Sequence, residues 1–259
     1  SGGYGLATRI AAAFGSGAAT VGLSFEKAPS DTKPGTPGWY NNRAFDEAAT
    51  AAGLVTATLD GDAFSNEAKD EVIATARRLG LVFDLVVYSL ASPVRTDPAT
   101  GIMHRSVLKP IGQSFKGRSV DVFTGRFSDA EVGPCEEEDI ANTVKVMGGE
   151  DWELWIKALA KAGLLAKDAT TVAYSYIGPA LSWPIYRDGT IGRAKIHLDA
   201  TAKSMTARAI VPGLKAYVSV NKAVVTRASA VIPIIPLYVS VLFKVMKARG
   251  NHEDCIAQM

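Results

Sequence analysis

Cysteine and histidine are scarce in this sequence. Among 259 residues there are two cysteines, Cys135 and Cys255, and three histidines, His104, His197 and His252. Two cysteines so far apart provide no disulfide framework and are typical of a protein from a reducing compartment. The histidines are scattered, and none pairs with a cysteine at the spacing of metal ligands. The sequence therefore predicts neither a disulfide-stabilised fold nor a metal site.

An excess of one charge and a long apolar run are also absent. The formal net charge is +2 with both signs interspersed, so the basic stripe of a nucleic-acid-binding protein is missing. The most apolar stretch, residues 231–243, is shorter than a membrane span and contains two prolines. We interpret it either as a buried helix or as one wall of an apolar ligand pocket. A serine hydrolase is disfavoured too, because the chain lacks a nucleophile elbow.

The composition is that of a globular protein, with strand and helix signals that alternate. Strands are predicted at residues 19–25, 54–59, 81–91, 171–176 and 216–220. Helices are predicted at residues 7–14, 43–52, 64–79, 136–147, 150–162, 194–209 and 229–248, with Asn66 and Thr190 as helix caps. Residues 27–43 are expected to form a loop, and residues 119–128 a hairpin. The alternation favours an α/β fold with a doubly wound, Rossmann-type parallel sheet.

The first 26 residues resemble the second half of a nucleotide-binding βαβ unit whose first strand is missing. Glycines such as Gly2 and Gly3 before a helix let the backbone approach a pyrophosphate, and the helix N-terminus supplies free N–H groups. Glu26 follows the next strand, where an acid accepts hydrogen bonds from the adenosine ribose and disfavours a phosphate there. That position predicts NADH rather than NADPH, while the alternative for Glu26 is a solvated residue after a strand.

Ligands of such sheets bind at the carboxyl ends of the strands. Asp62-Ala63 follows one predicted strand, Leu90-Ala91 ends the next, and Tyr176 ends a third. We expect these residues to lie at one edge of the sheet.

Residues 174–195 contain three tyrosines and Lys195. A phenol has a pKa near 10, and a nearby ammonium lowers it. A Tyr186–Lys195 pair beside a nucleotide would therefore suit proton donation that accompanies hydride transfer. The spacing of the pair is not one helical turn, so the loop has to fold Tyr186 back toward Lys195. The alternative is that the tyrosines are partly buried aromatics and Lys195 a surface residue.

Several strings of residues carry a family resemblance. Eight residues separate Tyr186 from Lys195, and the other strings are residues 61–64, 86–93, 109–112, 146–152, 174–179 and 183–186. Together they resemble the trans-2-enoyl-CoA reductase family, also called the FabV type of enoyl-acyl-carrier-protein reductase, over essentially the whole chain. Residues 96–101 and 252–259 are most similar to the euglenoid-type enzyme.

The resemblance implies an enlarged short-chain-dehydrogenase-like fold that uses NADH to reduce trans-2-enoyl thioesters of CoA or acyl carrier protein in fatty acid synthesis. It implies that Tyr186 donates the proton, that Tyr176 contacts the thioester oxygen and that Lys195 contacts the cofactor. The run 231–243 would line or support the acyl pocket. The remaining cofactor contacts implied are Ser1, Gly2, Gly3, Tyr4, Phe25, Glu26, Asp62, Ala63, Leu90, Ala91, Val224, Val225 and Thr226.

The expected organisation is a single NADH-binding domain over residues 1–259, incomplete at both ends, with residues 92–165 inserted on the substrate side. We expect a monomer in the cytoplasm, or in the mitochondrion if the source is eukaryotic. Ala180 and Arg187 depart from the family pattern. They motivate a second hypothesis, a catalytically impaired nucleotide-binding subunit or scaffold. A general short-chain ketoreductase is a third.

Overall fold

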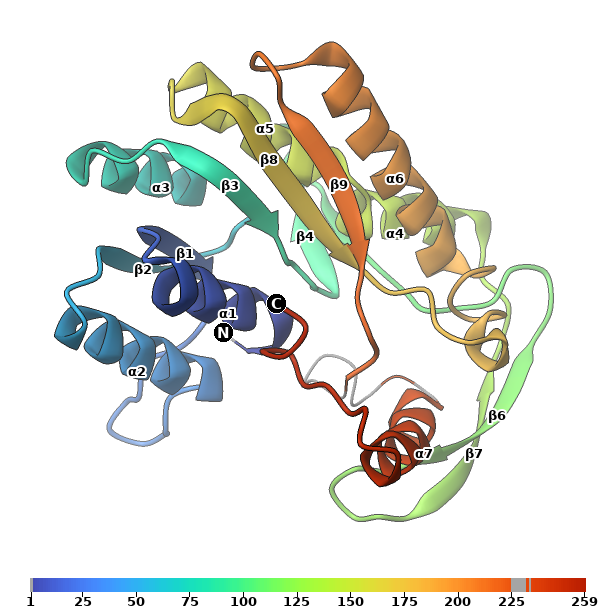
Figure 1. Cartoon of the computed structure of the whole chain (residues 1–259). Helices are drawn as coiled ribbons and strands as arrows, with labels where there is room; N and C mark the ends of the chain where they lie inside the picture. Colours follow the sequence, from blue (N-terminus) through green and yellow to red (C-terminus); the bar gives the residue numbers. More distant parts are fainter. Residues whose placement is uncertain (1, 225–231, 233) are drawn as a thin grey trace.

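Parallel strands form the centre of the protein, whose computed structural model describes residues 2–224, 232 and 234–259. These strands are β1 (Thr20–Ser24), β2 (Thr56–Asp60), β3 (Phe83–Tyr88), β8 (Leu165–Ser175) and β9 (Lys215–Val220). Within the described residues, β1 pairs with β2, and β3, β8 and β9 form a second ladder in that order (Figure 1). Every one of these pairings is parallel. The predicted α/β fold with a parallel sheet is confirmed, and its strands are divided between two ladders.

The β1–β2 ladder has one polar and one apolar face. Helix α1 (Gly3–Ile10) covers the polar face, where the Arg9 guanidinium donates to the hydroxyls of Thr56 and Thr58 at 2.5 and 2.8 Å. Successive side chains of a strand point to opposite faces, so the residues between these threonines face the other way. On that opposite face, Val21, Leu23 and Leu59 pack against helix α3 (Asn66–Arg78).

A shared apolar core joins the two ladders. Val72 and Ala76 of α3 pack with Trp155 and Leu159 of helix α5 (Glu150–Lys161), and this cluster contacts strands of both ladders. A second cluster places α5 and helix α6 (Thr190–Arg208) against β8 and β9. The helices thus fix the relative positions of the strands on which the predicted site residues lie.

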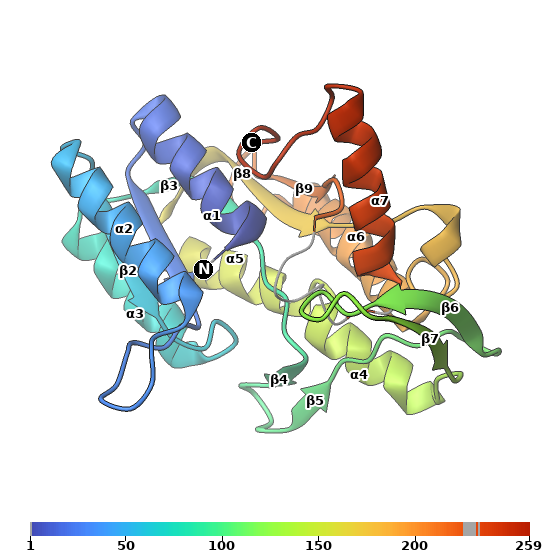
Figure 2. The ribbon, with the colours of Figure 1, turned by 90° about the horizontal axis from the view of Figure 1, so that it is seen from below.

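Ahead of α5, the segment between β3 and β8 carries two short antiparallel pairs and one further helix. They are β4 (Val94–Thr96) with β5 (Met103–Arg105), β6 (Phe115–Val120) with β7 (Phe127–Val132), and α4 (Glu137–Met147). The β6–β7 pair confirms the predicted hairpin, which is longer than expected. It lies against helix α7 (Ile235–Ala248), where a Cβ on Gly117 would approach Ile234 to 2.6 Å (Figure 2). In the part of the chain that the structure describes, no helix is long and apolar enough to cross a membrane.

Several predicted boundaries and caps were wrong. Residues 27–43 are not all loop, because helix α2 (Pro37–Ala51) begins at a proline, whose fixed φ suits a first helical turn. The first helix begins at Gly3 rather than residue 7 and continues as a π-helix over Ala11–Gly15. Ser65, not Asn66, caps α3 and accepts from Ala68 N–H. Gly189 takes the cap position of α6, because the Thr190 hydroxyl is bound to a neighbouring loop.

Candidate active site

The structure brings Tyr176 and Tyr186 together at the carboxyl end of β8. Tyr176 follows the last residue of that strand, and the chain then turns at Gly178, whose φ is 80°. The two tyrosine rings meet edge to face, with their centroids 5.0 Å apart and an interplanar angle of 83°. The loop thus folds Tyr186 back onto Tyr176, whereas the predicted approach was to Lys195, and the described residues show no hydrogen bond between Tyr186 and Lys195.

Local contacts fix the path of this loop. A Cβ on Gly178 would lie 3.1 Å from the Tyr176 ring, so a larger residue there would displace the tyrosine. The Trp183 indole N–H donates to the Gly178 carbonyl at 3.1 Å. The Tyr186 N–H donates to the Ser182 carbonyl at 2.9 Å, which ends a short 3-10 turn over Ala180–Ser182. Tyr186 is therefore positioned by the backbone and not only by side-chain packing.

The hydroxyl of Tyr176 is buried and has no hydrogen-bond partner among the described residues. A buried polar group without a partner is costly and rare in folded proteins. Burial, with the nearby Tyr238 and Tyr186, raises the pKa of Tyr176 well above the ordinary value of a phenol. An unpartnered, protonated hydroxyl at the end of a central strand is suited to donate to a ligand oxygen.

Tyr186 also stays protonated at neutral pH. Burial raises the pKa of Tyr186 to about 12. The expectation that the Lys195 ammonium would lower the pKa of this phenol is wrong, since desolvation of the phenolate is the only cause resolved. A phenol that holds its proton until a basic carbon develops nearby is chemically a donor rather than a base.

Lys195 is not a freely solvated surface residue. Burial lowers the pKa of Lys195 to about 8. Across residues 2–224, 232 and 234–259, its ammonium has neither an ion pair nor a hydrogen bond to another side chain, including Tyr186. A cation held partly out of water without an anion next to it is available for an anionic or polar ligand.

The first turn of α6, which precedes Lys195, is anchored to the loop at residues 107–110. The Thr190 N–H donates to the Lys109 carbonyl at 3.0 Å, and the Thr190 hydroxyl donates to the Val107 carbonyl at 2.5 Å. A Cβ on Gly192 would collide with the Arg187 carbonyl, so the chain after Tyr186 packs directly on this turn. The string at residues 109–112 therefore helps to position Lys195.

The N-terminus of α1 lies against the ends of strands in the other ladder. A Cβ on Gly5 would lie 3.2 Å from the Ser89 hydroxyl, which shows how closely the helix approaches the end of β3. The Tyr4 hydroxyl donates to the Lys222 carbonyl after β9 at 2.7 Å. These contacts bring residues 2–4 to the segments that contain the predicted cofactor residues Leu90, Ala91 and Val224.

The ends of β1 and β2 lie side by side. The Gly61 N–H donates to the Ser24 carbonyl at 2.8 Å, so Glu26 and Asp62 follow neighbouring strands at the same edge. A Glu26 carboxylate oxygen accepts from the Thr36 hydroxyl at 2.5 Å, which argues against a freely solvated side chain. Phe25 is 73% exposed.

Three of the residues predicted to contact the cofactor lie outside the described part of the chain, namely Ser1, Val225 and Thr226. Positions 231 and 233 of the apolar run lie outside it as well.

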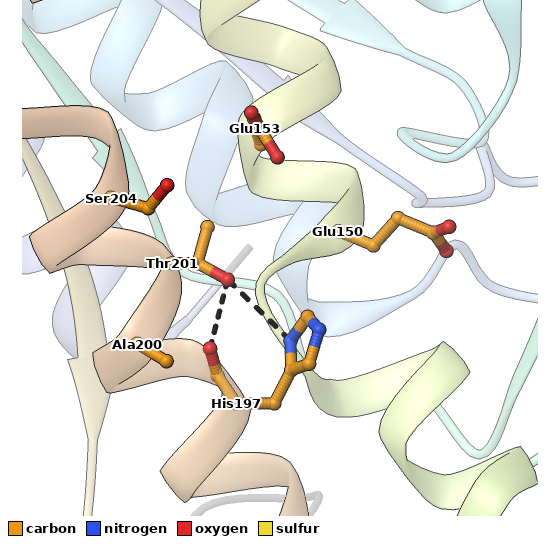
Figure 3. Close-up of a pocket in the computed structure, with 6 residues that line it drawn as sticks. All are labelled: Glu150, Glu153, His197, Ala200, Thr201 and Ser204. Carbon is orange, nitrogen blue, oxygen red and sulfur yellow. Dashed lines mark hydrogen bonds between the residues drawn. The ribbon is translucent and has the colours of Figure 1, made fainter. Parts of the chain in front are cut away.

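A surface pocket of about 390 Å³ lies between α5 and α6, apart from the residues predicted for the site (Figure 3). His197 Nδ1 accepts the Gly149 N–H at 3.0 Å, and the Thr201 hydroxyl donates to the His197 carbonyl at 2.8 Å. The bond from Gly149 joins α6 to the cap of α5, and the bond from Thr201 lies within α6, so we assign His197 a structural role. The pocket is lined by Glu150, Glu153, His197, Ala200, Thr201 and Ser204.

The Arg187 side chain contacts two neighbouring residues at the surface of residues 176–187, which we call the tyrosine loop. Its guanidinium lies 3.5 Å from the centre of the Trp183 ring and makes two hydrogen bonds to the Asp188 carboxylate, of 2.7 and 2.9 Å. This departure from the family pattern therefore adds a local surface ion pair.

Sequence reasoning missed a buried polar group beneath the Asp62-Ala63 turn. Lys69 of α3 is 4% exposed and contacts Asp151 of α5, which is 1% exposed. The available signal was a lysine at position 69 on the same helical face as the core residues Val72 and Ala76.

Two family models match the chain. The model described as the trans-2-enoyl-CoA reductase catalytic region matches residues 33–259, and the NAD(P)H binding domain of trans-2-enoyl-CoA reductase matches residues 1–31. The chain belongs to the trans-2-enoyl-CoA reductase family.

Individual relatives agree with this assignment. Over all of its length, the chain is 63% identical to a trans-2-enoyl-CoA reductase [NADH] of Treponema denticola, and over 99% of its length it is 59% identical to an enoyl-[acyl-carrier-protein] reductase [NADH] of Flavobacterium johnsoniae. The chain spans 65% of the length of both relatives. The crystal structure of the Treponema enzyme in complex with NAD matches 99% of this chain and 64% of that one, with a TM-score of 0.95.

The fold extends to a more distant protein. An enoyl-[acyl-carrier-protein] reductase of Aquifex aeolicus, 15% identical, matches 98% of this chain and 79% of its own with a TM-score of 0.55. At that identity the likeness shows a common fold alone.

Proposed function

We propose that the protein catalyses the NADH-dependent reduction of the carbon–carbon double bond of trans-2-enoyl thioesters to acyl thioesters, in fatty acid synthesis. The observation that carries the proposal is the edge-to-face pair of Tyr176 and Tyr186, in which the buried Tyr176 hydroxyl has no partner among the described residues. Membership of the family and the names of the relatives, which are enoyl-CoA and enoyl-[acyl-carrier-protein] reductases, support the substrate class.

The residues divide the chemistry among them. When bound, NADH supplies the hydride that adds to the β-carbon of the enoyl thioester. Tyr176 donates a hydrogen bond to the thioester oxygen, where negative charge develops as the double-bond electrons move toward it. Tyr186 then delivers its proton to the α-carbon and regains one from solvent, so that hydride and proton together saturate the double bond. The Lys195 ammonium contacts the cofactor and keeps it in register with the substrate.

The cofactor side of the site fits NADH. The glycines at the start of α1 permit close approach, and its N-terminal N–H groups suit the pyrophosphate. Glu26, held by Thr36, is placed to accept hydrogen bonds from the adenosine ribose and to repel a phosphate. Asp62-Ala63 and Leu90-Ala91 would complete the binding surface at the strand ends.

Crotonyl-CoA-dependent oxidation of NADH by the full-length protein tests this proposal, with NADH binding measured in parallel. NADH binding without substrate-dependent oxidation would favour the impaired scaffold instead. Activity on ketones but not on enoyl thioesters would identify a ketoreductase.

The same proposal extends to the substrate side, the oligomeric state, the cellular location and the type of thioester. We propose that residues 92–165 form the substrate side of a single NADH-binding domain, and that the protein acts as a monomer in the cytoplasm. We further propose that the protein is of the euglenoid type and that it accepts a CoA thioester in preference to a carrier-protein thioester. Comparing crotonyl-CoA with a crotonyl carrier protein at equal concentration tests that preference.

A further inference from the structure

A buried ammonium holds the turn that contains Asp62 and Ala63. Lys69 Nζ donates to the carbonyls of Ala63, Phe64 and Ser65 at 3.2, 3.2 and 3.4 Å. The same ammonium donates to Asp151 Oδ1 at 3.0 Å, and both side chains are almost fully buried. Three consecutive carbonyls are thus drawn toward one charge beneath the turn.

Helix α5 adds two further contacts to this group. The Trp155 indole N–H donates to the Ala63 carbonyl at 2.9 Å. Asp151 Oδ2 accepts from the Tyr88 hydroxyl at 3.1 Å. Tyr88 is the last residue of β3, directly before the segment with Leu90 and Ala91. One carboxylate therefore connects the ends of β2 and β3, which belong to different ladders.

Two polar groups of the turn, the Ala63 N–H and the Asp62 carboxylate, can bind a ligand. The Ala63 N–H has no hydrogen-bond partner in the part of the chain that the structure describes. The Asp62 carboxylate accepts from the Phe64 N–H at 3.0 Å, which fixes its direction and leaves it further acceptor capacity. Among the described residues, the carbonyls of the turn are bound, while the unpaired Ala63 N–H and the spare acceptor capacity of Asp62 can serve a ligand with donors and acceptors.

We propose that Lys69, Asp151 and Trp155 are positioning residues that hold the Asp62-Ala63 turn in the conformation that binds the adenosine half of NADH. This inference rests on the proposed function. It explains why the strings at residues 61–64, 86–93 and 146–152, distant in sequence, meet in one buried group: they contribute Ala63, Tyr88 and Asp151 to it.

Trp155→Phe is the cleanest variant, because it removes one hydrogen bond to Ala63 and keeps an aromatic ring in the core. Trp152→Phe is its matched control. Trp152 lies on the same helix and is also buried, but its indole N–H donates to the Thr171 hydroxyl at 2.8 Å and does not touch the turn.

The experiment measures dissociation constants for NADH and ADP-ribose by calorimetry, together with steady-state kinetics on crotonyl-CoA, with the full-length protein. Trp155→Phe is expected to weaken both ligands about fivefold, the effect of losing one hydrogen bond. At saturating NADH, its kcat and its KM for crotonyl-CoA stay unchanged. Trp152→Phe keeps the wild-type affinity for both ligands.

A second variant examines the charged pair without leaving one charge buried alone. Lys69→Met/Asp151→Leu removes both charges together and is expected to weaken ADP-ribose about tenfold or more, because the ammonium no longer binds the three carbonyls of the turn or the carboxylate. Its fold is checked by circular dichroism.

The outcomes separate this inference from the proposed function. A wild-type protein that oxidises NADH with crotonyl-CoA, together with unchanged ligand affinity in Trp155→Phe, overturns the inference alone. Equal losses in Trp155→Phe and Trp152→Phe overturn it as well, because they indicate a general effect on the core. A wild-type protein that binds neither NADH nor ADP-ribose overturns both.

Discussion

Two regions of the molecule bury titratable groups in opposite ways. Beneath the Asp62-Ala63 turn, Lys69 and Asp151 are each matched by oppositely charged or hydrogen-bonding partners. Around the tyrosine loop, the buried Tyr176 hydroxyl has no hydrogen-bond partner among the described residues, and burial shifts the pKa values of Tyr186 and Lys195 toward their neutral forms. Burial with partners stabilises a conformation, whereas burial without them has a cost that a bound ligand can relieve. We therefore propose that the first region holds the Asp62-Ala63 turn in place and that the second region carries out the reaction.

The largest expected effect falls on the reacting region. Tyr186→Phe removes the proposed proton donor and should lower kcat by roughly 10²–10⁴-fold, the usual contribution of a general acid, with NADH affinity unchanged. Tyr174→Phe is the control, because its hydroxyl is bound to Thr8 and Met259 rather than exposed to the site. Crotonyl-CoA kinetics measure both. Wild-type turnover in Tyr186→Phe would remove this residue from the mechanism.

Substitutions in the region around Lys69 and Asp151 should mainly lower the free energy of unfolding. Lys69→Met leaves the Asp151 carboxylate buried without its ion-pair partner, and we expect unfolding to become easier by roughly 3–5 kcal/mol. Urea denaturation monitored by circular dichroism gives the value. Lys203→Met, which breaks an exposed pair with Asp199, should change stability by less than about 0.5 kcal/mol. Equal effects of the two variants would contradict the distinction.

The pH dependence of NADH affinity should report Lys195. Burial lowers the pKa of this ammonium to about 8, so its charge is lost as pH rises through that value in the free protein. NADH affinity is therefore expected to be constant below about pH 8 and to fall above it, before Tyr186, with a pKa of about 12, titrates. Lys195→Met should abolish this dependence. A fall that persists in Lys195→Met would assign it to another group.

The lowered pKa of Lys195 also predicts how the stability of the protein changes with pH. The unfolded state binds more protons at this lysine between about pH 8 and its ordinary value of 10.5, so the contribution of Lys195 to stability rises with pH across that window. Comparing the pH dependence of urea unfolding in wild-type protein and in Lys195→Met isolates this contribution.

The smallest effect is expected at Arg187. Because its guanidinium is used on Trp183 and Asp188, Arg187→Ala should change kcat/KM for crotonyl-CoA by less than about twofold. A loss of tenfold or more would show that this departure from the family pattern acts on the reaction.

Strand periodicity and family strings predicted much of this arrangement. Apolar runs located the central strands and the helices between them, because buried parallel strands and amphipathic helices leave distinct patterns in sequence. The chemistry predicted that Tyr186 folds back toward Lys195, but its contact with Tyr176 was not predicted; Gly178 and the bond from Trp183 provide the physical cause of that contact.

Other features could not be predicted, because they depend on burial. The pKa of Tyr186 was predicted to fall because of the Lys195 charge, but burial of the phenol raises it. Lys69 lies on α3 and its partners lie on the preceding turn and on α5, and only the packing of these elements brings them together. The same holds for Thr190, whose hydroxyl bonds to residue 107 instead of capping its helix.

Tyr176→Phe tests the contrast between the two regions most directly, because it removes one unpartnered hydroxyl and nothing else. The measurement pairs crotonyl-CoA-dependent NADH oxidation with urea unfolding of the same preparation. We predict that kcat/KM falls about 10²-fold while the free energy of unfolding stays equal or increases, since a buried donor without a partner has been deleted. Wild-type activity with reduced stability would contradict the assignment of this hydroxyl to the substrate.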